Sequence, residues 1–100
     1  MKGERKFILK IIKHLEREFD VIAWGYKWTN PNKTWNVWDI CINDYEVYQH
    51  SKKFKSITKV YHMAWKKRFP DNVRMGFAYC NPIEKNLLEL AEAGNLIMNV

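Results

Sequence analysis

The sequence predicts an α/β fold, a single small domain in which helices pack against a mixed β-sheet. Three observations support this. The chain has 100 residues, enough for one domain with its own core. Apolar residues make up 47% of it, which disfavours a disordered chain. Segments with helical periodicity alternate with segments rich in aromatic and β-branched residues. We therefore expect residues 1–100 to form one globular domain, in the order helix, strand, strand, helix, strand, helix and short strand.

The N-terminal part of the chain predicts a helix followed by a β-hairpin. Residues 4–19 place apolar side chains at the spacing of one buried helix face: Ile8, Ile11, Ile12, Leu15 and Phe19. Residues 21–28 and 34–42 are rich in aromatic and β-branched side chains, which favour strands. The segment 29–33 between them has the composition of a turn. These two strands are expected to pair antiparallel.

One register of this hairpin places most of the large apolar side chains on the same face. That face, expected to be the core, holds Ile22, Trp24, Tyr26, Trp38, Ile40 and Ile42. The opposite face includes Lys27, Asp39 and Cys41. It also carries Ala23 and Gly25, which are small enough to admit a packed helix.

The second half of the chain predicts a β-α-β unit. Ser51 is suited to cap a helix that ends near Phe69, and residues 70–72 then stop it. Residues 73–80 alternate as a strand, with Val73, Met75, Phe77 and Tyr79 on one face. The strands before and after this helix should form a parallel pair, because a crossover connection joins them.

A third helix and a short strand complete the prediction. Asn81 as N-cap, Pro82 and Glu84 mark a helix start, and Gly94-Asn95 marks its end. Residues 96–100 are expected to form the last strand. The polar groups where the parallel strands end could also hold a small anion, although capping explains Asn81 more simply.

Composition excludes several classes of protein. No apolar run approaches the length of a membrane-spanning helix, and the charged N-terminal segment lacks the pattern of a signal peptide. Two cysteines do not make a disulfide framework, so a reduced, cytoplasmic setting is expected. The formal net charge is +6, from 17 Lys and Arg against 11 Asp and Glu. A basic protein of this kind favours polyanionic partners.

The positive charge is concentrated on two predicted helices. On the second helix a stripe of basic side chains follows spacings of three and four: Lys52, Lys55, Lys59, His62 and Lys66. Residues 51–69 contain no acidic residue, although like charges at this spacing repel each other. The first helix repeats the pattern with Lys2, Lys6, Lys10, Lys13 and Arg17. These stripes predict contacts with a nucleic-acid backbone; the alternative is that they are only the solvated faces of amphipathic helices.

Two tryptophans flank the hairpin loop, Trp28 and Trp35. Exposed aromatic rings beside a basic surface can stack on bases, as in proteins that bind single strands. They can also contact another protein, or simply pack on each other and close the hairpin. Trp24 and Trp38 are expected in the core because of strand alternation.

No motif predicts catalysis or a bound cofactor. Cys41, Cys80, His50 and Asp44 could be assembled into a zinc site, but none of them is paired at the short spacing typical of zinc ligands. A thiol nucleophile at Cys80 would need a base and an orienting group, and the sequence does not indicate the latter. We expect no metal and no cofactor.

The order of elements, with Asp39 in a strand and Glu16 or Glu18 on the first helix, resembles metal-dependent nucleases of the restriction-endonuclease-like class. Those enzymes carry an acid-x-Lys triplet on the strand that follows. The only such triplet here, Glu4-Arg5-Lys6, precedes the core of the first helix. The resemblance implies a divalent ion near Asp39, and without the lysine and second carboxylate it supports two-metal hydrolysis poorly.

Two functions therefore remain ahead of a hydrolase. The first is a small non-catalytic module that binds the nucleic-acid backbone through the lysine stripes. The second is a protein-interaction module, an inhibitor or accessory factor, that docks on a larger acidic partner or self-associates through its Trp28/Trp35 edge or its terminal strand.

Overall fold

The computed structural model describes residues 3–29, 32, 36–69, 73–81, 91 and 94–99. Its elements are α1 (Glu4–Glu18), β1 (Ala23–Thr29), β2 (Asn36–Ile42), α2 (Tyr45–His50), α3 (Lys52–Arg68), β3 (Val73–Tyr79) and β4 (Leu96–Met98). The α/β class is confirmed, and so is the mixed sheet. Apart from Ala91, which is helical, the predicted helix between β3 and β4 lies outside the described residues, as does Trp35.

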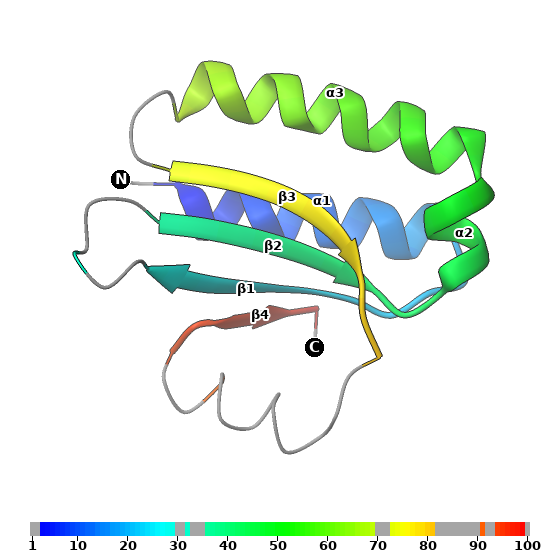
Figure 1. Cartoon of the computed structure of the whole chain (residues 1–100), viewed down its shortest axis with the longest axis horizontal. Helices are drawn as coiled ribbons and strands as arrows, with labels where there is room; N and C mark the ends of the chain where they lie inside the picture. Colours follow the sequence, from blue (N-terminus) through cyan, green and yellow to red (C-terminus); the bar gives the residue numbers. More distant parts are fainter. Residues whose placement is uncertain are drawn as a thin grey trace.

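The described strands form one sheet in the order β3-β2-β1-β4 (Figure 1). β1 pairs antiparallel with β2, which confirms the hairpin, and antiparallel with β4 on its other side. β2 pairs parallel with β3, which confirms the β-α-β unit. The edges of the described sheet are therefore β3 and β4.

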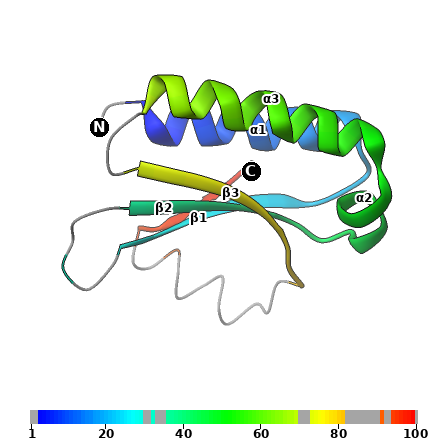
Figure 2. The same ribbon diagram turned by 45° about the horizontal axis from the view of Figure 1, so that its top comes forward.

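Both long helices lie on one face of this sheet (Figure 2). α1 packs over β1 and β4, and α3 packs over β3. The predicted apolar face of α1 is buried: Ile8, Ile11, Ile12 and Leu15 have no exposed surface. From α3 and its C-terminal end, Phe54, Trp65 and Phe69 complete this core against Trp38, Ile40 and Met75 of the sheet. Among the described residues, this packing of helices on one sheet face follows from helices that each have one apolar face.

The predicted hairpin register is wrong by one residue. In the structure Gly25 pairs with Ile40 and Lys27 with Trp38, so β1 turns its small side chains, not Trp24 and Tyr26, toward α1. The cause is the close approach of α1: a Cβ atom on Gly25 would lie 2.6 Å from Cγ2 of Ile8. Trp24 is still buried, but on the face of the sheet away from α1.

Two side-chain caps shape the connection between β2 and α3. Asp44 accepts a hydrogen bond from the Val47 backbone nitrogen at 3.0 Å and starts the short helix α2, which the sequence analysis did not predict. Ser51 accepts one from the Phe54 nitrogen at 3.0 Å, so the predicted N-cap of α3 is confirmed. Within the part of the chain that is described, no helix is both long and apolar enough to cross a bilayer.

Candidate functional site

The two basic helices run antiparallel, and they approach each other at three places. Near the start of α1, a Cβ atom on Gly3 would lie 3.4 Å from Nη2 of Arg68, so the backbone there is close to the guanidinium at the end of α3. In the middle, Nδ1 of His14 lies 2.6 Å from the Tyr61 hydroxyl. At the far end Glu18 forms an ion pair with Lys53. The two helices therefore approach each other at both ends and in the middle, and a groove lies between them.

This groove has a volume of about 720 Å³. Five cations line it, and four of them belong to the predicted α1 stripe: Lys6, Lys10, Lys13, Arg17 and Arg68. None of the described residues that line it is acidic. Arg68 was not predicted to contribute, because it does not follow the spacing of the α3 stripe. Its position one helical turn beyond Ala64, on the side facing α1, is the signal that could have indicated it.

Uncharged aromatic rings lie among these cations. Phe7 packs edge-to-face on Tyr61, with ring centroids 6.3 Å apart, and on Trp65 at 5.6 Å. Burial raises the pKa of the Tyr61 hydroxyl, so it stays protonated at neutral pH and brings no negative charge into the groove. The Tyr61 hydroxyl shares a hydrogen bond with Nδ1 of His14, and the tautomer of the imidazole decides which of the two atoms donates. Apolar walls of this kind strengthen the field of the cations beside them.

An ion pair joins the two helices just beyond Arg17, one of the residues that line the groove. The Lys53 ammonium hydrogen-bonds to the Glu18 carboxylate and holds the pKa of that carboxyl below its usual value. Glu18 also lies 3.8 Å from Nε2 of His14. The Glu18 carboxylate, which follows Arg17 in the sequence, is therefore paired with a lysine from the other helix.

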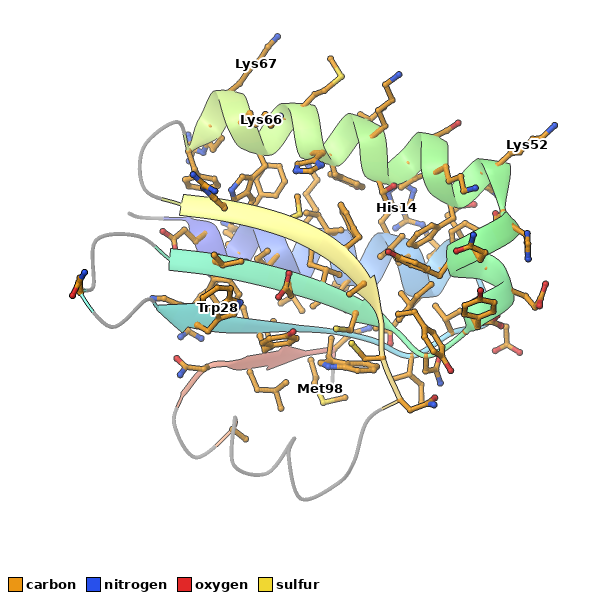
Figure 3. All side chains as sticks on the ribbon, in the orientation of Figure 1. His14, Trp28, Lys52, Lys66, Lys67 and Met98 are labelled. Atoms are coloured by element: carbon orange, nitrogen blue, oxygen red, sulfur yellow. The ribbon has the colours of Figure 1, made fainter. Side chains whose placement is uncertain are left out.

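The predicted α3 stripe lies on the other flank of its helix. Four of its members, with Thr58 and Met63, line a second hollow of about 420 Å³: Lys55, Lys59, His62 and Lys66. Lys55 and His62 also border a hollow that reaches Phe77 of the edge strand β3. This flank faces away from α1, so the two stripes share one side of the sheet but not one groove. Lys52 stands exposed at the start of α3 (Figure 3).

The predicted aromatic contact does not lie beside these cations. Trp28 is 43% exposed, at the end of β1 next to the hairpin loop (Figure 3). Its Nε1 donates to Oδ2 of Asp39 at 3.3 Å, and both side chains lie on the sheet face opposite the helices. The structure therefore separates Trp28 from the basic helices by the thickness of the sheet. The second predicted ring, Trp35, lies outside the described residues.

The residues considered for metal chemistry are dispersed. Glu16 accepts from the Ala23 nitrogen at 3.1 Å and lies on the helix side of the sheet, whereas Asp39 lies on the other side. Asp44 caps α2, and His50 at the end of α2 is 3.9 Å from Glu46. Among the described residues, no three His, Cys, Asp or Glu side chains lie close enough together to hold a metal ion.

The side chains of the two cysteines, in contrast, are in contact. Sγ of Cys41 in β2 is 2.7 Å from Sγ of Cys80, which follows β3. Both are free thiols. The zinc-site hypothesis grouped these cysteines with His50 and Asp44, but it is the parallel pairing of the two strands that brings the two sulfur atoms, 39 residues apart in sequence, together.

Comparison with known proteins adds no relative to this description. The chain matches no protein-family model, and no curated protein or solved structure is significantly similar to it.

Proposed function

We propose that this protein is a non-catalytic module that binds the sugar-phosphate backbone of a nucleic acid in the groove between α1 and α3. The observation that carries the proposal is the groove itself: five cations line it, and none of its described lining residues is acidic. Lysine and arginine side chains neutralise phosphates and release condensed counterions, and this binding does not depend on base sequence.

The dimensions of the groove suit a backbone. The four cations of α1 span residues 6–17, which is about 16 Å along a helix axis. That length matches the rise of about five nucleotides in one strand of a duplex. The α3 flank, with Lys55, Lys59 and Lys66, adds positive charge on the same side of the sheet and attracts the same polyanion at longer range.

Salt dependence tests the proposal. Labelled single- and double-stranded DNA and RNA are titrated with the protein at several salt concentrations, and binding is followed by fluorescence anisotropy. If all five cations contact phosphates, the logarithm of the association constant should fall with that of the salt concentration with a slope of about −4.5 on duplex DNA and about −3.5 on a single strand. Lack of binding at low salt would refute the proposal.

Matched triple variants locate the site. Replacing Lys6, Lys10 and Lys13 by alanine should reduce the slope on duplex DNA by about 2.7, because three phosphate contacts disappear. The same replacement of Lys55, Lys59 and Lys66 removes equal charge from the other flank, and it should reduce the slope less. Equal losses from the two variants would show that net charge alone, and not the groove, attracts the ligand.

A second proposal is a contact with an acidic protein through α3. Val60 and Met63 are 65% and 57% exposed on the outer side of this helix, and Lys59 and Lys66 lie close to Met63. Exposed apolar side chains with a basic rim suit a partner that combines an apolar patch with carboxylates. Binding to a partner that is lost in a Val60→Ser/Met63→Ser variant, while nucleic-acid affinity is unchanged, would favour this function. Light scattering tests the predicted self-association through the Trp28/Trp35 edge or the terminal strand.

A further inference from the structure

The parallel pairing of β2 and β3 brings two cysteines of distant sequence together. Cys41 lies in β2 opposite Ala78, and Cys80 lies two residues beyond Ala78, on the same face of the sheet. The Cys80 backbone nitrogen donates to the Ile42 carbonyl at 3.1 Å, which keeps the chain against β2 just after β3 ends. The backbone therefore fixes both side chains on one face, next to each other.

The sulfur atoms are within reach of a covalent bond. Their separation of 2.7 Å exceeds the length of a disulfide bond by only about 0.7 Å, so a small side-chain rotation is enough to close it. In the strand register the two cysteines are diagonal neighbours, because Cys41 lies opposite Ala78 and Cys80 follows two residues later, and their sulfur atoms approach each other across this diagonal.

The two thiols differ in access to solvent. Cys41 has no exposed surface, while Cys80 is partly exposed. Burial, together with the neighbouring Cys80 and Asp39, raises the pKa of the Cys41 thiol. An oxidant from solution therefore meets Cys80 first, and Cys41 is protected until the bond forms between them.

We propose that Cys41 and Cys80 form a dithiol site that a low-molecular-weight disulfide, such as oxidised glutathione, converts into an intramolecular disulfide. The thiolate of Cys80 attacks one sulfur of the oxidant, forms a mixed disulfide and releases one glutathione thiolate. Cys41 then loses its proton and attacks Sγ of Cys80, which expels the second glutathione. The two cysteines lose two protons and two electrons, and one oxidised glutathione becomes two reduced molecules.

The new bond closes a loop of about 40 residues that contains α2, α3 and β3. Loops of this length give a large stabilisation, because the crosslink restricts the unfolded chain. We expect the melting temperature of the oxidised protein to exceed that of the reduced protein by roughly 10 °C or more. This inference is independent of nucleic-acid binding, since both sulfurs lie on the sheet face away from the helices.

The test is incubation of the reduced full-length chain with excess oxidised glutathione at pH 8, followed by acid quenching and intact mass spectrometry. The wild-type protein should lose the mass of two hydrogen atoms, lose both titratable thiols and stay monomeric, and a dithiol reductant should reverse the change. The melting temperature, measured in parallel, should rise upon oxidation and fall again upon reduction.

Two single variants separate the roles of the thiols. Cys41→Ala should accumulate one glutathione adduct on Cys80, since nothing displaces it. Cys80→Ser should stay unmodified, because its remaining thiol is buried. The proposal is overturned if folded wild-type protein stays fully reduced, if it accumulates adducts instead of losing two hydrogens, or if the bond forms between two chains. All of these outcomes are measured on the wild-type protein, so the proposal can still be confirmed or overturned if one of the variants does not fold.

Discussion

Gly25 offers the sharpest test of how α1 packs on the sheet. It sits in β1 under α1, and a Cβ atom there would lie 2.6 Å from Cγ2 of Ile8 and 3.6 Å from Cδ1 of Ile12. The nearer atom is a branch methyl of a side chain with no exposed surface, so it cannot swing away. In a Gly25→Ala variant α1 itself has to move.

The expected magnitude follows from two opposing effects. Overpacking a core by one methyl group costs about 1–3 kcal/mol. Alanine in place of glycine within a strand regains about 0.5–1 kcal/mol of backbone entropy. The net result for Gly25→Ala is a loss of about 1–2 kcal/mol in the free energy of unfolding, which for a domain of this size lowers the melting temperature by about 5–15 °C.

Denaturant titration and thermal melts followed by circular dichroism measure the change. Gly76→Ala is the matched control, because a Cβ atom there would lie 3.4 Å from Oδ1 of Asp39 and meet nothing closer. That variant should be neutral or slightly stabilised. Ile8→Leu removes the branch methyl, so a double-mutant cycle with Gly25→Ala should show that the combined loss is smaller than the sum.

A neutral or stabilised Gly25→Ala protein would refute the close approach. It would also reopen the alternative register, in which Trp24 and Tyr26 face α1. Equal losses from Gly25→Ala and Gly76→Ala would likewise show that glycine is needed in both strands for a reason other than contact with Ile8.

Two further outcomes are expected. The buried Glu4 carboxylate accepts from Nε1 of Trp38 at 3.0 Å, so Glu4→Ala should lower the free energy of unfolding by about 1–3 kcal/mol in denaturant titrations, and Glu4→Gln, which keeps an acceptor, by less. Lys53 lowers the pKa of Glu18 in the folded protein. The ion pair therefore stabilises the fold fully when the pH is above the pKa of Glu18 in the unfolded chain, and this stabilisation is lost as the pH falls through the pKa of Glu18 in the folded protein. Lys53→Ala should therefore raise the Glu18 pKa in a carbon-13 NMR titration and destabilise the protein more at pH 7 than at pH 3; an unchanged Glu18 pKa would contradict the pairing.

Periodicity predicted the long elements well, because each of them buries a single face. The apolar spacing of α1, the Ser51 cap of α3 and the parallel pairing of the strands around α3 were all visible in the sequence and are confirmed. The short helix α2 was missed. Its only sequence signal is Asp44, whose side chain was weighed as a ligand while its ability to cap a helix was overlooked.

The hairpin register failed for a physical reason. The prediction placed the core on the face with the largest apolar side chains, although it also noted that Ala23 and Gly25 could admit a helix on the opposite face, where α1 in fact packs. Here both faces of β1 are buried near its start, since Trp24 is 2% exposed and Ala23 is fully buried on the other side. Hydrophobicity then does not distinguish the two faces of β1. The small side chains of Ala23 and Gly25 instead indicate the face on which α1 packs.

The candidate site shows what a one-dimensional charge pattern cannot specify. Both stripes are real features of the sequence, yet a stripe on one helix is a convex surface, and a concave site requires a second element beside it. α3 supplies that element to α1, through Tyr61 on its inner side and Arg68 at its end, neither of which belongs to the spacing that defines the α3 stripe. The α3 stripe faces the sheet edge, where no cation from α1 reaches it. Since the field of like charges is strongest in a cleft with apolar walls, phosphate affinity should reside mainly with the α1 residues, although the purer of the two sequence patterns lies on α3.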